Sequence, residues 1–391
     1  MHTSVNKKNN RMVTTFILAT VISCLLSSAI CTPSIAKEAP WWPIPVKSYY
    51  GEYDKNKKVT GQASTSLDGP KLEEWYAPPR ANRPYTIGVS FPHMKDSYWV
   101  AVNYGIIEEA KRLGVGVKLL EAGGYDSLGT QHEQVRQLMR SDVDGIVLGS
   151  ISYSGNNKIV RAAAKKDTPV VEVINDVSAA DISAKALVSF NEMGYFAGEF
   201  VAEHAEENGL DDMKIVFLPG PNGSGWAPET LDGFTAAMEF YPGLVDVLDV
   251  QWGDTGKAVQ GALIRKVLME NNRIDYLVCN AVAAEVAPAI LKELGRDKSI
   301  SVVSTYIIPS LYDKISAGEV IAAPSDLTVF QGRMAVGMIV RLLNGEKAGR
   351  DFPFRSGPFI PMITPENISS YPYEGLFGPR DYRPVFSLEP K

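Results

Sequence analysis

The sequence has 391 residues, of which 45% are hydrophobic, and its formal net charge is −6 at pH 7. This length and this apolar fraction allow a sizeable core and more than one domain. An acidic chain is poorly attracted to nucleic acid or to anionic membrane surfaces, so both are excluded as main partners.

Residues 1–36 predict a secretory signal peptide. Three positive charges at residues 7–11 precede a mostly apolar stretch from Met12 to Ile30, and Ser34-Ile35-Ala36 offers a small-residue cleavage site. Removing these charges takes the formal net charge from −6 to −9. The expected location is the periplasm. A membrane anchor, or a lipoprotein signal ending at Cys24, remains as an alternative.

The cysteines indicate how an exported chain is stabilised. Cys24 and Cys31 would leave with the signal, and only Cys279 of the three would remain. A single cysteine forms no internal disulfide, so a large hydrophobic core must hold the fold. Cys279 follows an apolar run and is predicted to be buried, not catalytic.

Residues 37–83 are rich in Trp, Tyr, Pro and Lys without a sustained period. Aromatic residues at this density seldom stay in contact with water. We therefore predict an ordered but irregular N-terminal arm that wraps over the surface of the following domain.

From about residue 84 to residue 345, strand-like and helix-like patterns alternate. The predicted strands are Tyr85–Phe91, Gly116–Glu121, Gly145–Gly149, Pro169–Val173, Ala186–Phe190, Lys214–Leu218, Val245–Gln251, Tyr276–Cys279, Ile300–Thr305 and Val320–Ala323. The predicted helices are Tyr98–Leu113, Gly129–Ser141, Ile159–Lys166, Glu192–Asn208, Pro228–Phe240, Thr255–Asn271, Ala283–Glu293, Ile308–Ala317 and Thr328–Leu343. This alternation is typical of an α/β fold, and so many strands favour two lobes with parallel sheets. The tail, residues 344–391, is predicted to wrap or to form an interface.

The first strand–helix–strand unit carries residues suited to binding a small molecule. Such a unit gives parallel strands with a right-handed crossover. Open α/β sheets bind ligands in the loops after their strands, and this loop holds Asp96, Tyr98 and Trp99. The loop lacks a glycine-rich nucleotide fingerprint, so the expected ligand is another small molecule.

The sequence lacks the motifs of common enzyme classes. Only His93, His132 and His204 follow the signal, and none lies in an HExxH spacing. The glycine-rich segment Pro221–Gly225 holds a serine without GxSxG spacing or an evident histidine partner. We predict no enzymatic activity, no metal and no cofactor. His93 is interpreted as a surface or capping residue in preference to an acid or base.

Several short motifs occur together in the order and spacing of one protein family. They are KDSYW (95–99), NYG (103–105), LEAGGY (120–125), LGS (148–150), LPGP (218–221), AAE (283–285), AAPSD (322–326) and YRPVF (382–386). On these motifs the chain resembles type I periplasmic binding proteins, and within them the branch that senses trimethylamine N-oxide. The resemblance implies two Rossmann-like lobes, a hinge of three crossings and a ligand enclosed between the lobes.

The resemblance also implies where the hinge crossings fall, near Ser189–Asn191, Leu327–Thr328 and Pro353–Arg355. We accordingly predict an N-terminal lobe of residues 84–189 plus 328–353. Residues 190–327 plus 354–391 are predicted to form the C-terminal lobe and tail.

Members of this family bind their ligands with loops from both lobes. Carried over by position, the predicted ligand-binding residues are Asp96, Tyr98, Trp99, Asn175, Phe190, Trp226, Asn280, Tyr306 and Asp326. Trp226 is a weaker member of this set, since only its place in a loop after a strand supports it, and Ile174, Pro228 and Tyr125 are further weak candidates. Structural roles stay open for six of them, namely Tyr98, Trp99, Phe190, Asn280, Tyr306 and Asp326. Trp99 would cover the sheet end, Asn280 would form a turn, and Asp326 would cap the helix 328–343.

The resemblance implies a ligand other than a sugar. Ile174, Asn175 and Tyr306 stand where sugar binders of the family place arginine and aspartate. A pocket with fewer charges and more aromatic residues suits a small ligand with methyl groups and a cationic centre, such as trimethylamine N-oxide. The implied partner is the periplasmic sensor domain of a membrane histidine kinase, and the alternative is a transporter.

Overall fold

The computed structural model describes residues 43–57, 64 and 66–391. The predicted signal peptide lies outside these residues. Within them, no helix combines the length and the apolar character needed to cross a lipid bilayer.

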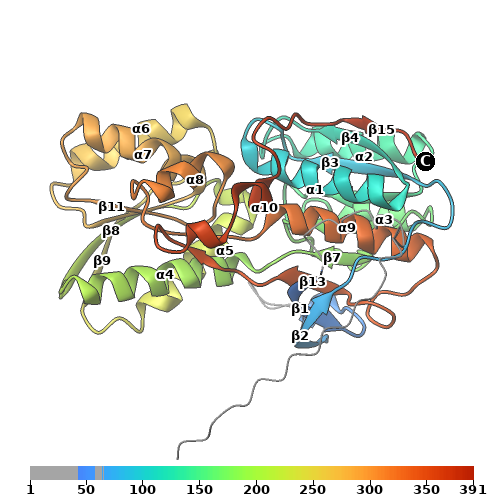
Figure 1. Ribbon diagram of the computed structural model, residues 1–391, viewed down its shortest axis with the longest axis horizontal. Helices are drawn as coiled ribbons and strands as arrows, with labels where there is room; N and C mark the ends of the chain where they lie inside the picture. The colour runs from blue at the N-terminus through green and yellow to red at the C-terminus, as the bar shows by residue number, and fades with distance from the viewer. Residues whose placement is uncertain (1–42, 58–63, 65) are drawn as a thin grey trace, which may run out of the picture. The chain divides into compact units, whose positions relative to one another are not determined.

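The larger sheet holds nine strands in the order β15-β4-β3-β5-β6-β7-β13-β1-β2 (Figure 1). The strands are β1 (Ile44–Tyr50), β2 (Asp68–Trp75), β3 (Thr86–Phe91), β4 (Gly116–Glu121), β5 (Gly145–Leu148), β6 (Val170–Val173), β7 (Ala184–Ala186), β13 (Arg355–Pro358) and β15 (Ser387–Leu388). The run from β4 to β13 pairs in parallel, while β1, β2 and β15 pair antiparallel at the two edges.

Helices cover both faces of this sheet. They are α1 (Ser97–Leu113), α2 (Leu128–Arg140), α3 (Asn157–Ala164) and α9 (Thr328–Leu343). Successive side chains of β5 point to opposite faces. Val147 belongs to the core cluster that includes α1 and α9, whereas Ile146 and Leu148 belong to the cluster formed with α2 and α3. We call this sheet and its helices the first lobe.

The second lobe repeats this plan on a four-stranded parallel sheet in the order β11-β10-β8-β9. Its elements are β8 (Asp212–Leu218), β9 (Leu244–Val250), β10 (Tyr276–Cys279), β11 (Ser301–Ser304), α4 (Phe190–Glu207), α5 (Trp226–Met238), α6 (Lys257–Glu270), α7 (Ala281–Glu293) and α8 (Pro309–Ser316). Phe217 packs with the α4 and α5 side of the core, and Val216 packs with the α6 and α7 side.

Helices α4 and α5 cross at unusually short range because glycine lies at both contact points. A Cβ atom on Gly194 would lie 1.9 Å from the Thr230 carbonyl oxygen, and one on Gly233 would lie 1.9 Å from the Asn191 carbonyl oxygen. Since any side chain would push the helices apart, this crossing fixes how α4 leaves the first lobe.

The chain passes between the two lobes three times. The first passage joins β7 to α4, and the second runs from the short strand β12 (Ala323–Pro324) to α9 through Leu327, which has a φ of 50°. The third passage, residues 359–361, joins β13 to the short strand β14 (Met362–Ile363), which pairs with β12. Helix α10 (Tyr373–Phe377) contacts α1, α8 and α9 before β15 returns to the larger sheet.

The α/β fold with two parallel-sheet lobes and a three-crossing hinge is confirmed, and three details of the prediction are wrong. The described part of the arm is not irregular, because β1 pairs with both β2 and β13. The third passage lies after residue 358 and not near Pro353–Arg355, because β13 pairs with β7 of the first lobe. Strand β15 likewise returns the tail to the first lobe.

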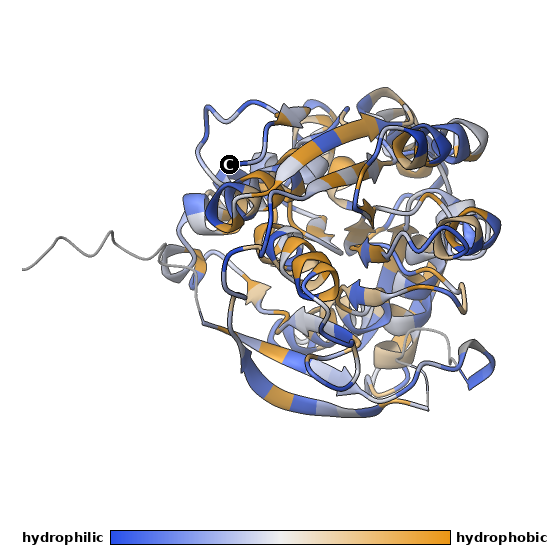
Figure 2. Ribbon diagram, turned by 90° about the vertical axis from the view of Figure 1, so that its right-hand side faces the viewer, coloured by the Kyte–Doolittle hydropathy of each residue, from blue (hydrophilic) through white to orange (hydrophobic). Residues whose placement is uncertain are grey.

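Hydropathy follows this architecture. Figure 2 shows hydrophobic residues along the strands and on parts of the helices, while hydrophilic residues dominate the outer loops. The buried residues of both lobes form continuous clusters. Cys279 is fully buried among them, as predicted.

Candidate ligand-binding site

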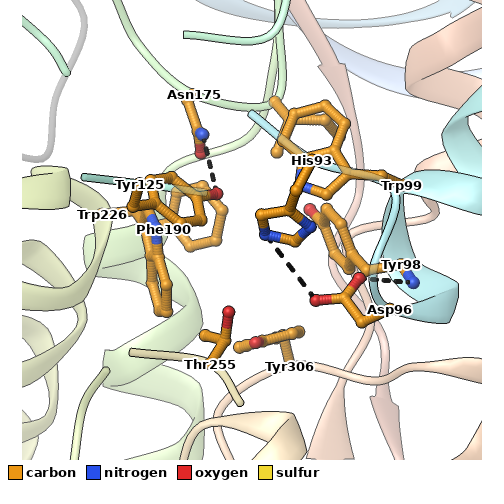
Figure 3. A pocket seen from close by; sticks show the side chains of 11 residues that line it. His93, Asp96, Tyr98, Trp99, Tyr125, Asn175, Phe190, Trp226, Thr255 and Tyr306 are labelled. Atoms are coloured by element: carbon orange, nitrogen blue, oxygen red, sulfur yellow. Dashed lines mark hydrogen bonds and ion pairs between the residues drawn. The ribbon is translucent and has the colours of Figure 1, made fainter. Parts of the chain in front are cut away.

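A cavity with about 310 Å³ of empty space lies where the loops after the parallel strands of the two lobes meet. Part of this space is open to solvent. It is lined by His93, Asp96, Tyr98, Trp99, Tyr125, Ile174, Asn175, Phe190, Trp226, Thr255 and Tyr306 (Figure 3). Parallel strands place the segments that follow them at one sheet edge, which is why residues that follow seven different strands converge here.

Aromatic side chains form most of the wall. They are Tyr98, Trp99, Tyr125, Phe190, Trp226 and Tyr306. Trp226 connects them, because its ring centroid lies 5.8 Å from that of Phe190, 6.2 Å from that of Tyr125 and 5.7 Å from that of Tyr306. Figure 3 shows Tyr125, Phe190 and Trp226 opposite Tyr98 and Trp99. Such walls attract methyl groups and cations.

One carboxylate, that of Asp96, faces this aromatic wall. Its Oδ1 accepts a hydrogen bond of 3.1 Å from the Tyr98 backbone N–H and thereby caps α1. Burial raises the pKa of the Asp96 carboxyl to about 6. The cavity therefore stabilises the negative charge poorly, and a bound cation would stabilise it.

His93 is buried in the cavity wall, although the sequence favoured a surface or capping role. Its Nε2 lies 3.9 Å from the Asp96 Oδ2, and neither ring nitrogen hydrogen-bonds to a residue that the structure describes. Burial lowers the pKa of His93 to about 4, so the imidazole is neutral at pH 7. A neutral imidazole offers a ligand one donor and one acceptor.

Three further polar groups differ in what they offer a ligand. The amide N–H groups of Asn175 donate hydrogen bonds to the Tyr125 hydroxyl at 3.1 Å and to the Ser150 carbonyl at 2.8 Å, so Asn175 positions Tyr125. The Tyr125 hydroxyl accepts that bond and keeps its own proton for an acceptor in the cavity. The Thr255 Oγ1 is buried without a hydrogen-bond partner among the described residues.

Backbone strain marks the same wall. Ile174 has a φ of 70°, which a β-branched residue rarely adopts. Its backbone N–H donates to the Ala186 carbonyl at 3.2 Å, which ties this turn to β7. The turn brings both Ile174 and Asn175 to the cavity.

Two of the predicted ligand-binding residues do not line the cavity. Asn280 caps α7, since its Oδ1 accepts hydrogen bonds of 3.1 Å from the backbone N–H groups of Val282 and Ala283. Asp326 lies behind the wall and accepts hydrogen bonds from the Tyr98 hydroxyl and from Gln331. It does not cap α9 either, because that helix has no side-chain cap. The other predicted ligand-binding residues all line the cavity, and the weaker candidate Pro228 does not.

Sequence reasoning missed His93 and Thr255 and underrated Tyr125. Each follows a strand of a parallel sheet, which is the signal that selected Asp96 and Tyr306. His93 and Thr255 lie within four residues of a predicted strand end, so a rule that considered every polar residue there would have included both.

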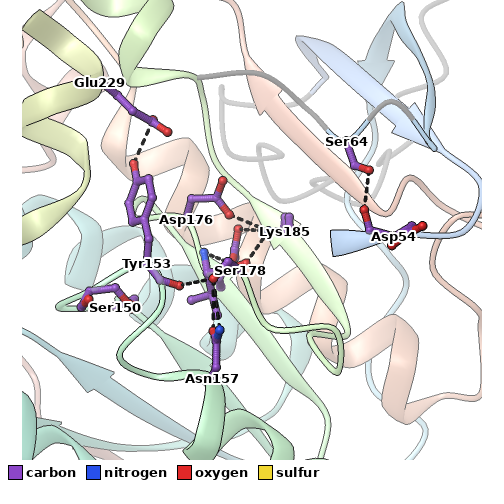
Figure 4. A network of polar contacts seen from close by, with 12 residues as sticks. Asp54, Ser64, Ser150, Tyr153, Asn157, Asp176, Ser178, Lys185 and Glu229 are labelled. Atoms are coloured by element: carbon purple, nitrogen blue, oxygen red, sulfur yellow. Dashed lines mark hydrogen bonds and ion pairs between the residues drawn. The ribbon is translucent and has the colours of Figure 1, made fainter. Parts of the chain in front are cut away.

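Two polar contacts join the lobes beside the cavity. At the rim, the Lys95 Nζ lies 2.6 Å from the Asp254 Oδ2. Deeper in the molecule, the Tyr153 hydroxyl donates to the Glu229 Oε2 at 3.1 Å (Figure 4). Both contacts connect a loop of the first lobe with the second lobe, so the structure is a closed arrangement.

The sequence of this chain matches known binding proteins over most of its length. The pattern of the periplasmic binding protein domain family matches residues 87–347. The periplasmic protein TorT of Escherichia coli K12 is 32% identical over 309 residues, which is 79% of this chain and 86% of TorT.

Solved structures agree with this match. A solute-binding protein of an ABC transporter from Bradyrhizobium sp. BTAi1, with bound bis-tris, is 35% identical with a TM-score of 0.74, covering 89% of this chain and 99% of its own. TorT in its complex with the TorS sensor domain is 29% identical with a TM-score of 0.68, covering 77% of this chain and 99% of its own. The resemblance to TorT is confirmed, and the chain belongs to the family of periplasmic binding proteins.

Proposed function

We propose that this protein binds a small methylated amine oxide, trimethylamine N-oxide or a close analogue, in the cavity between its lobes. The observation that carries the proposal is the enclosure of one carboxylate, Asp96, by six aromatic side chains in about 310 Å³. Aromatic faces and a carboxylate together favour a methylated cationic nitrogen over a sugar.

The polar groups of the cavity indicate how such a ligand would lie. Its positive nitrogen and methyl groups would face Asp96 and the aromatic rings. Its oxide oxygen would turn away from the carboxylate and accept a hydrogen bond from the Tyr125 hydroxyl. A ligand held in this way is bound unchanged, and the match to the periplasmic binding protein domain family supports this.

The proposed partner is the periplasmic sensor domain of a membrane histidine kinase. The TorT of the solved complexes, 29% identical to this chain, is bound to the TorS sensor domain, in one structure in the presence of trimethylamine N-oxide. We also propose export to the periplasm after cleavage near residue 36, where such a partner would be met. A ligand that favours the closed arrangement would change the surface that the sensor domain contacts.

A second candidate is the solute-binding component of a transporter. The Bradyrhizobium relative, described as an ABC transporter protein, is 35% identical and covers 89% of this chain. The fold and cavity serve both functions equally, so the partner decides between them.

One calorimetric experiment tests the proposed function. The chain without residues 1–36 is titrated with trimethylamine N-oxide alone and in the presence of the cognate kinase sensor domain, with ribose as the control ligand. We expect binding of the oxide, no binding of ribose, and different dissociation constants in the two titrations, because coupled sites alter each other's affinity by the same factor. Absence of oxide binding would contradict the proposed ligand. Equal dissociation constants with and without the sensor domain would favour a role as the binding component of a transporter.

A further inference from the structure

We infer that the protein has a second binding site, for a small organic carboxylate, in the cavity between the N-terminal hairpin and the first crossing of the hinge. This cavity has about 1060 Å³ of space, part of it open to solvent. It lies between strands β1, β2 and β13 and the start of α4, and Arg355 is part of its lining. No residue is shared with the lining of the aromatic cavity.

The side chain that carries the inference is Arg355. It is 6% exposed, yet its guanidinium has no carboxylate partner among the described residues. Its contact is with an aromatic face, because its Cζ lies 5.6 Å from the ring centroid of Tyr49, the residue directly opposite on β1. Buried arginines are usually paired with an acid.

The neighbouring strand shows what a paired cation looks like in this sheet. Lys185, in register with Arg355 on β7, has its Nζ 2.5 Å from the Asp176 Oδ1 and 3.2 Å from the Glu172 Oε1 (Figure 4). Both cations are buried, but only Lys185 is supplied with two acids. Arg355 is instead left facing a cavity, where an anion from solution can reach it.

The rest of the lining favours a carboxylate on an apolar body. The other cation, Lys47, is already paired with Glu192 at 2.6 Å, so Arg355 supplies the unbalanced positive charge. Leu67, Leu187 and Val188 add apolar surface. A guanidinium binds a carboxylate through two parallel hydrogen bonds, and the apolar surface would cover the remainder of the ligand.

Benzoate and its neutral isostere benzamide test this site in a way that does not depend on the proposed function. In calorimetric titrations of the wild-type protein saturated with trimethylamine N-oxide, or without it if it does not bind, we expect benzoate to bind at least about tenfold more tightly than benzamide. Arg355→Gln is expected to remove this preference, and Arg355→Lys to reduce it. Arg83→Gln, which removes an exposed arginine paired with Asp144 at 2.6 Å, is the control and is expected to keep it.

The position of the ligand is tested separately, in case Arg355→Gln fails to fold. Crystals grown with 4-iodobenzoate are expected to place the iodine signal in the cavity beside Arg355. A signal elsewhere, equal binding of benzoate and benzamide to the wild-type protein, or an unchanged preference in folded Arg355→Gln would each overturn the inference. Equally tight binding of inorganic sulfate would overturn the assignment to an organic carboxylate.

Discussion

At the scale of single residues, the proposed function depends on an acid placed where water does not stabilise it. Burial raises the pKa of Asp96 to about 6, and Lys95 outside the cavity opposes this only in part. Protonation of Asp96 and binding of a cation therefore compete. A ligand with a positive nitrogen should bind best when Asp96 is ionised.

We predict that the affinity for tetramethylammonium, whose charge does not change with pH, is constant above about pH 7 and falls as the pH drops below about 6. The limiting slope is up to tenfold per pH unit, because one proton competes with one ligand. Asp96→Asn should bind weakly at every pH and lose this dependence. Calorimetric titrations from about pH 5 to about pH 8, a range that extends to both sides of about pH 6, measure the affinity of the wild-type protein and of Asp96→Asn.

Asp326→Asn is the matched control for that experiment. Burial also raises the pKa of Asp326 to about 6, but this carboxyl lies behind Tyr98 and does not line the cavity. The control should keep the pH dependence of the wild-type protein. If the dependence vanished in Asp326→Asn and persisted in Asp96→Asn, the assignment of the ligand's counter-ion would be wrong.

Trp226 is the aromatic residue whose removal should affect binding most clearly. We predict that Trp226→Ala weakens the binding of trimethylamine N-oxide by about 1–3 kcal/mol, through lost burial and lost cation–π attraction. Trp75→Ala, at a buried tryptophan of the N-terminal hairpin, should lower thermal stability and leave affinity unchanged. Calorimetry with melting curves of both variants checks this, and similar affinity losses in the two would argue against a specific role of Trp226.

Trp99 is a less informative position because it serves two roles. Its ring lies 4.6 Å from that of Phe91 in the core, and it also lines the cavity. The Trp99 side chain therefore packs in the core, which is the structural alternative, and also faces the cavity, which is the binding role. Its replacement would change stability and affinity together.

The site could be predicted from the sequence where position after a strand and residue type pointed the same way, as for Asp96 and Trp99. Asn280 and Asp326 also follow strands. The Asn280 side chain, however, accepts hydrogen bonds from the backbone of α7, and the Asp326 side chain accepts one from Tyr98. Those partners depend on tertiary distances that one sequence does not contain. The burial of His93 was not predicted because its ring packs against Tyr125, which lies in the loop after a different strand.

At the scale of elements, the lobes were predictable because parallel strands covered on both faces are continuous apolar runs. Strands β3 to β6 and β8 to β11 therefore matched the expected ranges closely. Strand β2 was not predictable, because it lies at the sheet edge and most of its residues are exposed. Strand β1 pairs with β13, about three hundred residues later, and no local pattern encodes that pairing.

The close crossing of α4 and α5 gives a prediction about stability. Gly194→Ala should destabilise the protein by more than about 2 kcal/mol, because the new methyl group meets the backbone of Thr230. Gly261→Ala is the control, since its Cβ would meet only the Ile290 side chain at 3.7 Å. A helical glycine with such space should gain about 0.5–1 kcal/mol as alanine. Denaturant unfolding of both variants measures the change in the free energy of unfolding. Equal changes in the two variants would contradict the close packing of α4 and α5.

At the scale of the whole molecule, contacts between the lobes should set how readily the closed arrangement forms. The ion pair of Lys95 and Asp254 lies at the rim, next in sequence to Asp96 and Thr255, which face the cavity. Neither charged group needs to contact the ligand to affect its affinity. Each charged group affects the ligand affinity by changing the fraction of molecules in the closed arrangement.

We predict that Lys95→Ala weakens trimethylamine N-oxide binding by about 0.2–1 kcal/mol, the range for exposed ion pairs, and mainly by faster dissociation. Lys257→Ala is the control. It removes an ion pair of the same 2.6 Å length, with Glu285, that lies entirely within the second lobe. Stopped-flow dissociation rates of the two variants test this, and equal rates would mean that the rim pair does not act on closure.

We propose that the cavity recognises the charge on a methylated nitrogen and not merely the shape of a trimethyl group. Trimethylamine N-oxide and tert-butanol share that shape, but only the first has a formally positive central atom. Calorimetric titration of the wild-type protein with both compounds is the most direct test. We predict that the oxide binds at least about 2 kcal/mol more tightly, as expected for a cation desolvated among aromatic rings. Equal affinities, or no binding of the oxide, would contradict the account.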